Sequence, residues 1–259
     1  MTMPTTKEQL MSSDLNHVPT WVDLSVPDVA AAKELYGSLL GWTFQDQGPD
    51  MGHYNIALVD GEPVAGLMQT QGDEPAVWTP YFDTDDIDAS VEAVKRHGGS
   101  VMMEPMEIPG NGHMAIAVDP TGAVFGLWQD GEFSATELGA KHGQFAWTEC
   151  VTKDFDAALP FYIDALGWDA KEMGNEENFR YVTNGAGDAA ISGLFDAAGV
   201  LDEETPSHWR VYFAVSDTDA AIQRLVEAGG KLLDGPEDTM FGRIATVVDP
   251  QGVHFMLVS

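Results

Sequence analysis

The chain contains two copies of one sequence, and this repeat limits its possible folds more than any other feature. Blocks of the first half align with blocks of the second half in the same order, at offsets of 126 to 131 positions. The identities are eight of 26 for Trp21–Asp46 and Trp147–Glu172, six of 12 for Trp78–Ala89 and Trp209–Ala220, and six of 11 for Gly112–Gly122 and Gly242–Gly252. Such self-similarity indicates one structural unit used twice. We predict a first domain at residues 18–130, a linker at 131–140 and a second domain at 141–259.

Each copy divides again into two modules with the same order of elements. The stretch WVDLSV from Trp21 alternates as a half-buried strand does. Asp28 can then cap a helix whose apolar residues fall on one face, and Gly41 can end it. Short apolar runs bounded by Gly, Pro and Asp predict three further strands. Because this order recurs four times, we predict an α+β fold of four βαβββ modules.

The balance of charges limits the possible partners. The 259 residues include 42 acidic side chains but only 12 lysines and arginines, which gives a net charge of −30. Such a surface repels nucleic acid and anionic lipid and attracts cations. The acids are scattered along the chain, so that general solubility is an equally simple reason for them. No apolar run reaches the roughly 18 residues of a membrane span. We expect no nucleic-acid or membrane partner, and a monomer or homodimer.

Two further features concern the cellular location. The N-terminus lacks the basic and apolar blocks of a signal peptide. The single cysteine, Cys150, excludes an internal disulfide framework and should be a buried thiol on the helix side of its strand. Together these features predict a cytoplasmic protein.

The strand WVDLSVPD, the helix end YGSLLGW and the later run DPTGAVFGLW resemble the vicinal oxygen chelate superfamily. That superfamily includes glyoxalase I, bleomycin-resistance proteins and extradiol dioxygenases, and the chain is most similar to its two-domain, glyoxalase-like actinobacterial members. The resemblance implies that pairs of modules curl around a pocket. It therefore predicts two tandem glyoxalase-like half-barrel domains.

The same resemblance implies where a metal would bind. Metal-dependent members carry His or Gln on the first strand of a module and Glu on the last. Those positions fall here on Trp21, Thr79, Trp147 and Arg210, and on Gly66, Gly126, Gly193 and Met256. These side chains do not supply the ligands that a divalent ion takes in such sites. We expect no metal and no cofactor, which argues against glyoxalase I and dioxygenase chemistry.

Strand alternation indicates which side chains face the pocket instead. In each copy an indole, a carboxylate and a phenol share the inner face, and a guanidinium joins them in the second: Trp21, Asp23 and Tyr81; Trp147, Glu149, Tyr212 and Arg210. A buried acid needs hydrogen-bond donors and tends toward a raised pKa. These acids can organise the module interface, contact a ligand or transfer a proton, and the sequence leaves all three open.

Two basic positions also recur between the copies. His53 aligns with Arg180, and His113 aligns with Arg243. We expect them to form structural ion pairs with Asp23 and Glu149, and recognition of a ligand carboxylate or carbonyl is the alternative.

Three classes of function fit these observations. The first is a metal-free small-molecule-binding protein whose aromatic and acidic walls suit an aromatic or cationic ligand. The second is a glyoxalase-like lyase or oxygenase-type enzyme with a relocated metal or an organic cofactor. The third is a duplicated scaffold that acts through protein contacts.

Overall fold

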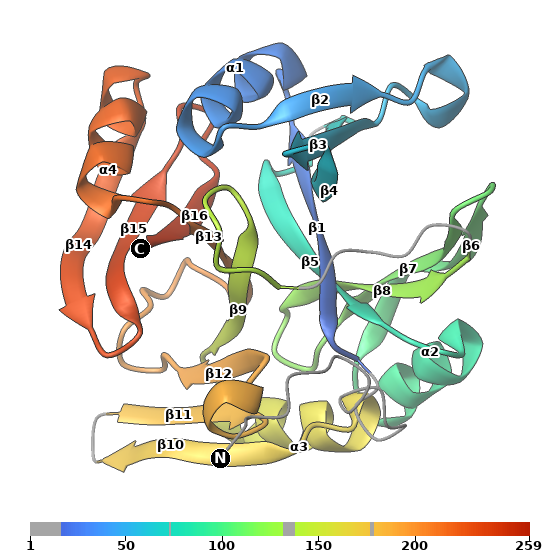
Figure 1. Cartoon of the computed structure of the whole chain (residues 1–259). Coiled ribbons are helices and arrows are strands. Elements are labelled where there is room, and N and C mark those ends of the chain that lie inside the picture. The colour runs from blue at the N-terminus through green and yellow to red at the C-terminus, as the bar shows by residue number, and fades with distance from the viewer. Residues whose placement is uncertain (1–16, 73, 132–137, 177–178) are drawn as a thin grey trace, which may run out of the picture.

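The computed structural model describes residues 17–72, 74–131, 138–176 and 179–259. These residues form four modules, each a strand, a helix and three strands (Figure 1). In the first half they are β1 (Pro19–Val26), α1 (Val29–Leu40), β2 (Thr43–Asp46), β3 (Asn55–Val59) and β4 (Glu62–Gln69), then β5 (Val77–Asp83), α2 (Ile87–Arg96), β6 (Ser100–Ile108), β7 (Gly112–Val118) and β8 (Val124–Asp130). In the second half they are β9 (Phe145–Thr152), α3 (Phe155–Leu166), β10 (Ala170–Glu176), β11 (Phe179–Asn184) and β12 (Ser192–Asp196), then β13 (His208–Ala214), α4 (Thr218–Glu227), β14 (Lys231–Thr239), β15 (Gly242–Val248) and β16 (His254–Val258).

The strands make two sheets of eight, one from each copy. The order is β2-β3-β4-β1-β5-β8-β7-β6 in the first sheet and β10-β11-β12-β9-β13-β16-β15-β14 in the second. Each sheet is joined at its centre by the antiparallel first strands of its two modules, with Trp21 opposite Tyr81 and Trp147 opposite Tyr212. The prediction of two similar half-barrels is confirmed, and the first and second modules share a sheet, as do the third and fourth.

The local signals for the helices explain their bounds. Asp28 caps α1 by accepting from the backbone N–H of Ala31 at 3.0 Å, and Asp154 caps α3 in the same way through Ala157 at 3.1 Å. A side-chain oxygen at this position satisfies one of the free N–H groups of the first turn. Gly41 ends α1 with φ of 71°, a conformation that glycine adopts without a steric penalty.

The two sheets pack against each other through the faces that carry the helices. One apolar core joins the first module to the fourth, including Leu24, Leu39, Phe213 and Phe255. A second core joins the second module to the third, including Phe125 and Phe161, and holds Cys150 as a fully buried thiol. The first module therefore shares a sheet with the second module but a core with the fourth. The third module shares a sheet with the fourth but a core with the second.

The repeated helix endings LYGSLLGW and FYIDALGW lie at these contacts between the copies. The Tyr36 hydroxyl of α1 donates to Asp249 Oδ2 at 3.2 Å, and the Tyr162 hydroxyl of α3 donates to Asp119 Oδ2 at 2.7 Å. Each tyrosine therefore bonds the aspartate that begins a DP turn of the other copy. We call these two hydrogen bonds the crossed tyrosine bonds.

In the described part of the chain, no helix combines the length and the apolar character needed to cross a membrane.

Candidate functional site

The face of the first sheet that does not carry the helices holds a hydrogen-bonded cluster. We call this face, and its counterpart in the second sheet, the concave face. Trp21 Nε1 donates to Asp23 Oδ1 at 2.8 Å, and the Tyr54 hydroxyl donates to the same oxygen at 2.5 Å. Tyr81 also hydrogen-bonds this carboxyl. Trp21, Asp23 and Tyr81 are 6%, 7% and 3% exposed. We call these four residues the first cluster; they form the floor of the concave face.

The second sheet repeats the arrangement in a more open form. The Tyr181 and Tyr212 hydroxyls donate to Glu149 Oε2 and Oε1 at 2.9 and 2.7 Å. Trp147 Nε1 lies 3.3 Å from the Tyr181 hydroxyl, and the indole is half-buried. Trp147, Glu149, Tyr181 and Tyr212 form the second cluster, which Arg210 approaches with Nη1 3.7 Å from Glu149 Oε1.

Burial decides the protonation of the first cluster. Desolvation raises the pKa of the Asp23 carboxyl above its usual value of 3.8, although its hydrogen-bond donors act in the opposite direction. Burial, followed by the charge of Asp23, also raises the pKa values of Tyr54 and Tyr81 far above 10. Both phenols therefore stay protonated as donors, and Asp23 is the group of this cluster that can titrate.

Glycines make room for these phenols at the positions where the superfamily places a carboxylate. A Cβ at Gly66 would overlap the Tyr54 hydroxyl and Asp23 Oδ1, and one at Gly126 would overlap the Tyr81 ring. A Cβ at Gly193 would likewise overlap the Tyr181 hydroxyl. A carboxylate side chain does not fit there while the tyrosines hold their places.

The available donor groups do not fit a metal ion of the kind found in metal-dependent relatives. The other expected ligand positions carry indole, hydroxyl, guanidinium and thioether groups, and within the described ranges no three His, Cys, Asp or Glu side chains are grouped to hold a metal. The absence of a metal ion therefore stays a prediction from the donor groups.

Sequence reasoning missed Tyr54 and Tyr181, although a signal was present. The sequence comparison singled out His53 and Arg180, and the residue after each is an identical tyrosine. The tyrosines turn inward to the clusters. The basic residues before them lie on the other side of the chain.

The predicted ion pairs of the recurrent basic residues with Asp23 and Glu149 are wrong. His53 Nδ1 lies 3.0 Å from Asp46 Oδ2, because the loop between β2 and β3, which contains a turn of 3-10 helix at Pro49–Met51, brings these two residues together. Arg243 bonds Asp219 and Asp238 at 2.7 and 2.9 Å. His113 is exposed on β7, opposite Glu107.

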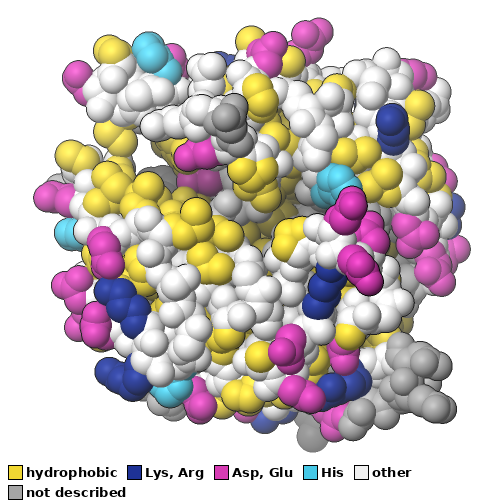
Figure 2. Space-filling view, turned by 180° about the vertical axis from the view of Figure 1, so that it is seen from behind, with side chains coloured by type: hydrophobic (Ala, Val, Ile, Leu, Met, Phe, Trp, Pro, Cys, Tyr) yellow, Lys and Arg dark blue, Asp and Glu magenta, His cyan; other side chains and the backbone are white. Residues whose placement is uncertain are grey.

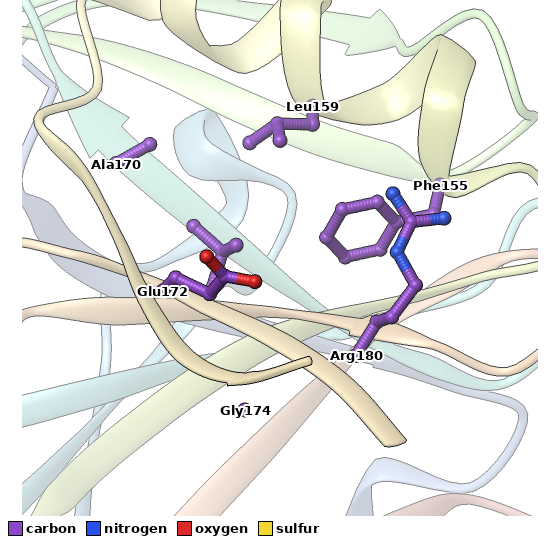
Figure 3. Close-up of a pocket in the computed structure, with 7 residues that line it drawn as sticks. Phe155, Leu159, Ala170, Glu172, Gly174 and Arg180 are labelled. Carbon is purple, nitrogen blue, oxygen red and sulfur yellow. The ribbon is translucent and has the colours of Figure 1, made fainter. Parts of the chain in front are cut away.

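Arg180 lines a cavity on the helix side of the second sheet. The cavity has a volume of about 240 Å³ and lies between α3 and the β10–β11 hairpin (Figure 3). The guanidinium lies 4.2 Å from the centre of the Phe155 ring and bonds Asp156 at 2.9 Å and Asp196 at 3.4 Å. Glu172 points into the same space. This cavity shares no lining residue with either cluster.

The walls above the two clusters differ in chemistry. Cross-strand pairing puts Met103, Ile116 and Gly126 in the row of Tyr81, and Met106, Met114 and Trp128 in the next row. Met103 and Met106 are 41% and 43% exposed. Figure 2 shows hydrophobic side chains bordering a hollow in the half of the molecule that the first sheet occupies.

The wall of the second concave face is aromatic. The rings of Phe179 and Tyr181 stack with centroids 6.1 Å apart and an angle of 9°, and Phe195 lies 5.9 Å from Phe179. Phe179 is 46% exposed. This face therefore offers a surface on which a planar ring can stack.

Comparison with known proteins matches both copies to the same family model. The family model described as Glyoxalase/Bleomycin resistance protein/Dioxygenase superfamily matches residues 15–127 and 144–257. Anthracycline biosynthesis protein DnrV of Streptomyces peucetius is 38% identical over an alignment of 259 positions that covers 93% of this chain and 92% of that protein.

Solved structures share the fold at low identity. The Mn(II)-bound glyoxalase of Novosphingobium aromaticivorans matches with a TM-score of 0.63 and 18% identity, covering 94% of this chain and 83% of that one. The 2,3-dioxygenase LapB of Pseudomonas matches with a TM-score of 0.66 and 12% identity, covering 94% and 93%.

Proposed function

Because the chain belongs to the Glyoxalase/Bleomycin resistance protein/Dioxygenase superfamily, we propose that it is a small-molecule-binding protein that holds an aromatic ligand without a metal ion. The ligand lies on the concave face of a sheet, above a cluster of indole, carboxyl and two phenols. One observation carries this proposal: both copies place an indole at a metal-ligand position of the first strand and phenols over the glycines at the other positions, and surround them with half-exposed apolar or aromatic side chains.

The cluster residues have separate parts in binding. Asp23 and Glu149 each accept from two tyrosines, so that they position the phenols and have little surface of their own, at 7% and 6% exposure. The indoles and the surrounding rings supply stacking area, and stacked or edge-on ring pairs contribute about 0.5–1.5 kcal/mol beyond their burial. Pockets of this kind take their affinity from apolar walls and their orientation from a few polar groups.

The relative DnrV supports an aromatic ligand through its name as an anthracycline biosynthesis protein. Anthracyclines contain fused planar rings with oxygen substituents, which is the class of molecule that an aromatic wall above two phenols would hold. For this chain we therefore propose a planar, oxygen-substituted aromatic ligand.

The test compares binding and stability in the same variants. The neutral probe 1,8-dihydroxyanthraquinone is titrated into the full chain and into Asp23→Asn and Glu149→Gln, with calorimetry for affinity and thermal unfolding for stability. The charge-assisted hydrogen bonds that hold the phenols are each worth about 1.5–3 kcal/mol. Where the probe depends on phenols held in this geometry, weakening one such bond should lower its affinity by up to about ten- to hundredfold.

The control is Glu172→Gln, which removes a carboxylate from the separate cavity beside α3. It should leave probe affinity unchanged. If Asp23→Asn and Glu149→Gln both lower the melting temperature but keep full affinity, the clusters only organise the sheets, and the proposal fails.

Proton transfer is a second candidate, favoured by the raised pKa of the buried Asp23 carboxyl. A general base must lie within hydrogen-bond reach of the proton it removes, and the three donors around Asp23 occupy that reach. We therefore expect the glutathione adduct of methylglyoxal to isomerise at the background rate. Turnover that Asp23→Asn abolishes would favour an enzyme instead.

A further inference from the structure

Three basic side chains gather at one corner of the second concave face. His208 and Arg210 are two residues apart on β13, so they share a face of the strand. The pairing of Tyr212 with Met256 places His254 of β16 beside Arg210. We call His208, Arg210 and His254 the basic corner.

Arg210 is one of only 12 lysine and arginine side chains in a chain whose net charge is −30. Burial lowers the pKa of His208, and the charges of Arg210 and His254 lower it further. His208 is therefore neutral at neutral pH, and Arg210 supplies a permanent positive charge.

Arg210 forms a long ion pair with Glu149, and its N–H donors make no hydrogen bond to the described residues. Its side chain is 25% exposed, and Nη1 lies 3.7 Å from Glu149 Oε1, which is too long for a hydrogen bond. Glu149 already accepts from Tyr181 and Tyr212. Within the described residues the guanidinium makes no hydrogen bond, whereas Arg243 bonds carboxylates at 2.7 to 3.1 Å.

The aromatic wall stands in the same row of the sheet as this corner. Tyr181 pairs with Phe195, Phe195 with Val151, and Val151 with His208. Phe195 and His208 are thus two strands apart, roughly 10 Å. A fused system of two or three rings that stacks on the wall can therefore place a substituent at the guanidinium.

The first copy has no such corner. Val77, Thr79 and Val124 stand at the positions of His208, Arg210 and His254. The chain therefore contains its own uncharged counterpart of the corner.

We infer that the second concave face recognises an aromatic carboxylate, with the rings on the Phe179, Tyr181 and Phe195 wall and the carboxylate on Arg210, whereas the first face takes only uncharged ligands. This inference rests on the proposed function. The planar guanidinium offers two parallel N–H donors, the geometry that a carboxylate accepts.

Two probes of equal shape test this inference on the full chain. Anthraquinone-2-carboxylate and anthraquinone-2-carboxamide are each titrated by calorimetry into the wild type and into Arg210→Thr, which copies the residue of the first copy. We expect the carboxylate to lose about ten- to hundredfold in affinity, as for a hydrogen bond to a charged group, and the amide to change less than about threefold.

Two further variants separate charge from geometry. Arg224→Thr removes the same charge from the exposed side of α4 and should change neither affinity. Arg210→Lys keeps the charge but loses the paired donors, so it should fall between the wild type and Arg210→Thr. This variant also serves if Arg210→Thr does not fold.

The outcomes distinguish a failure of the carboxylate site from a failure of the proposed binding function. If both probes bind and Arg210→Thr or Arg210→Lys weakens neither selectively, the carboxylate site is wrong, and the binding function stands. If neither probe binds the wild type, both are overturned.

Discussion

Replacing Tyr162 with phenylalanine removes one of the crossed tyrosine bonds, together with the weak hydrogen bond between its hydroxyl and the Cys150 thiol, and keeps the ring. The hydroxyl donates to Asp119 Oδ2 at 2.7 Å, and both residues are buried, at 0% and 4% exposure. The ring packs on Trp168 with centroids 4.8 Å apart, and this contact does not need the hydroxyl. The variant therefore removes the hydrogen bond between the copies without removing the packing of the ring.

The structure gives the size of the expected loss. Asp119 Oδ1 already accepts from the backbone of Thr121 and Ala123, whereas Oδ2 would keep only the weak thiol donor of Cys150 at 3.8 Å. A hydrogen bond to a charged group contributes about 1.5–3 kcal/mol. We expect the free energy of unfolding to fall by that amount, which for a chain of this size lowers the melting temperature by about 3–10 °C.

Urea unfolding followed by circular dichroism measures this loss, and Tyr36→Phe is the matched variant. Its hydroxyl donates to Asp249 over a longer 3.2 Å and also accepts from Trp78 Nε1 at 3.3 Å. We expect destabilisation by both variants. A change below about 0.5 kcal/mol in Tyr162→Phe would refute the view that these bonds hold the copies together.

Three further predictions concern single residues. Burial raises the pKa of Asp83 to about 6, so between about pH 4 and 6 the folded state binds more protons than the unfolded chain, and stability should fall as the pH rises through this range. Asp83→Asn can still accept from the Val18 N–H and should flatten this dependence. Unfolding curves measured from about pH 4 to 6 test the prediction. Gly126→Ala should destabilise by about 1–3 kcal/mol because its Cβ overlaps the Tyr81 ring, whereas Gly199→Ala, in open space, should cost far less, and equal unfolding curves for the two would contradict the geometry. Asp154→Ala should cost about 1 kcal/mol through the lost cap of α3, and an unchanged melting temperature would show that the cap is not needed.

The repeat made most of the fold predictable. The strand alternation of WVDLSV correctly placed Trp21 and Asp23 on one face and Leu24 in the core, because a period of two is fixed by the backbone. The module order and the two sheets follow from the four recurrences of the same elements. The packing of the first module against the fourth was not predictable, because the apolar pattern of a helix or strand does not indicate which other apolar face it contacts.

The clusters were only partly predictable for a related reason. Tyr54 lies just before the start of β3, where turn geometry decides the direction of its side chain, and Tyr181 is its counterpart within β11. The prediction of the ion pairs was wrong because other acids, Asp46 and Asp156, lie closer to His53 and Arg180. Such surface pairs depend on the local shape of the loops.

The crossed tyrosine bonds have the symmetry of an isologous dimer, in which the same pair of residues meets twice across the interface. Here the tyrosine of each copy bonds the aspartate of the other copy. A single ancestral copy would place the same tyrosine and aspartate at the same self-complementary surface. Fusing two such copies makes their association independent of protein concentration, since no free partner has to be found. It also frees each half from strict symmetry, so that one gene can keep Thr79 in one concave face and Arg210 in the other, which a homodimer cannot do.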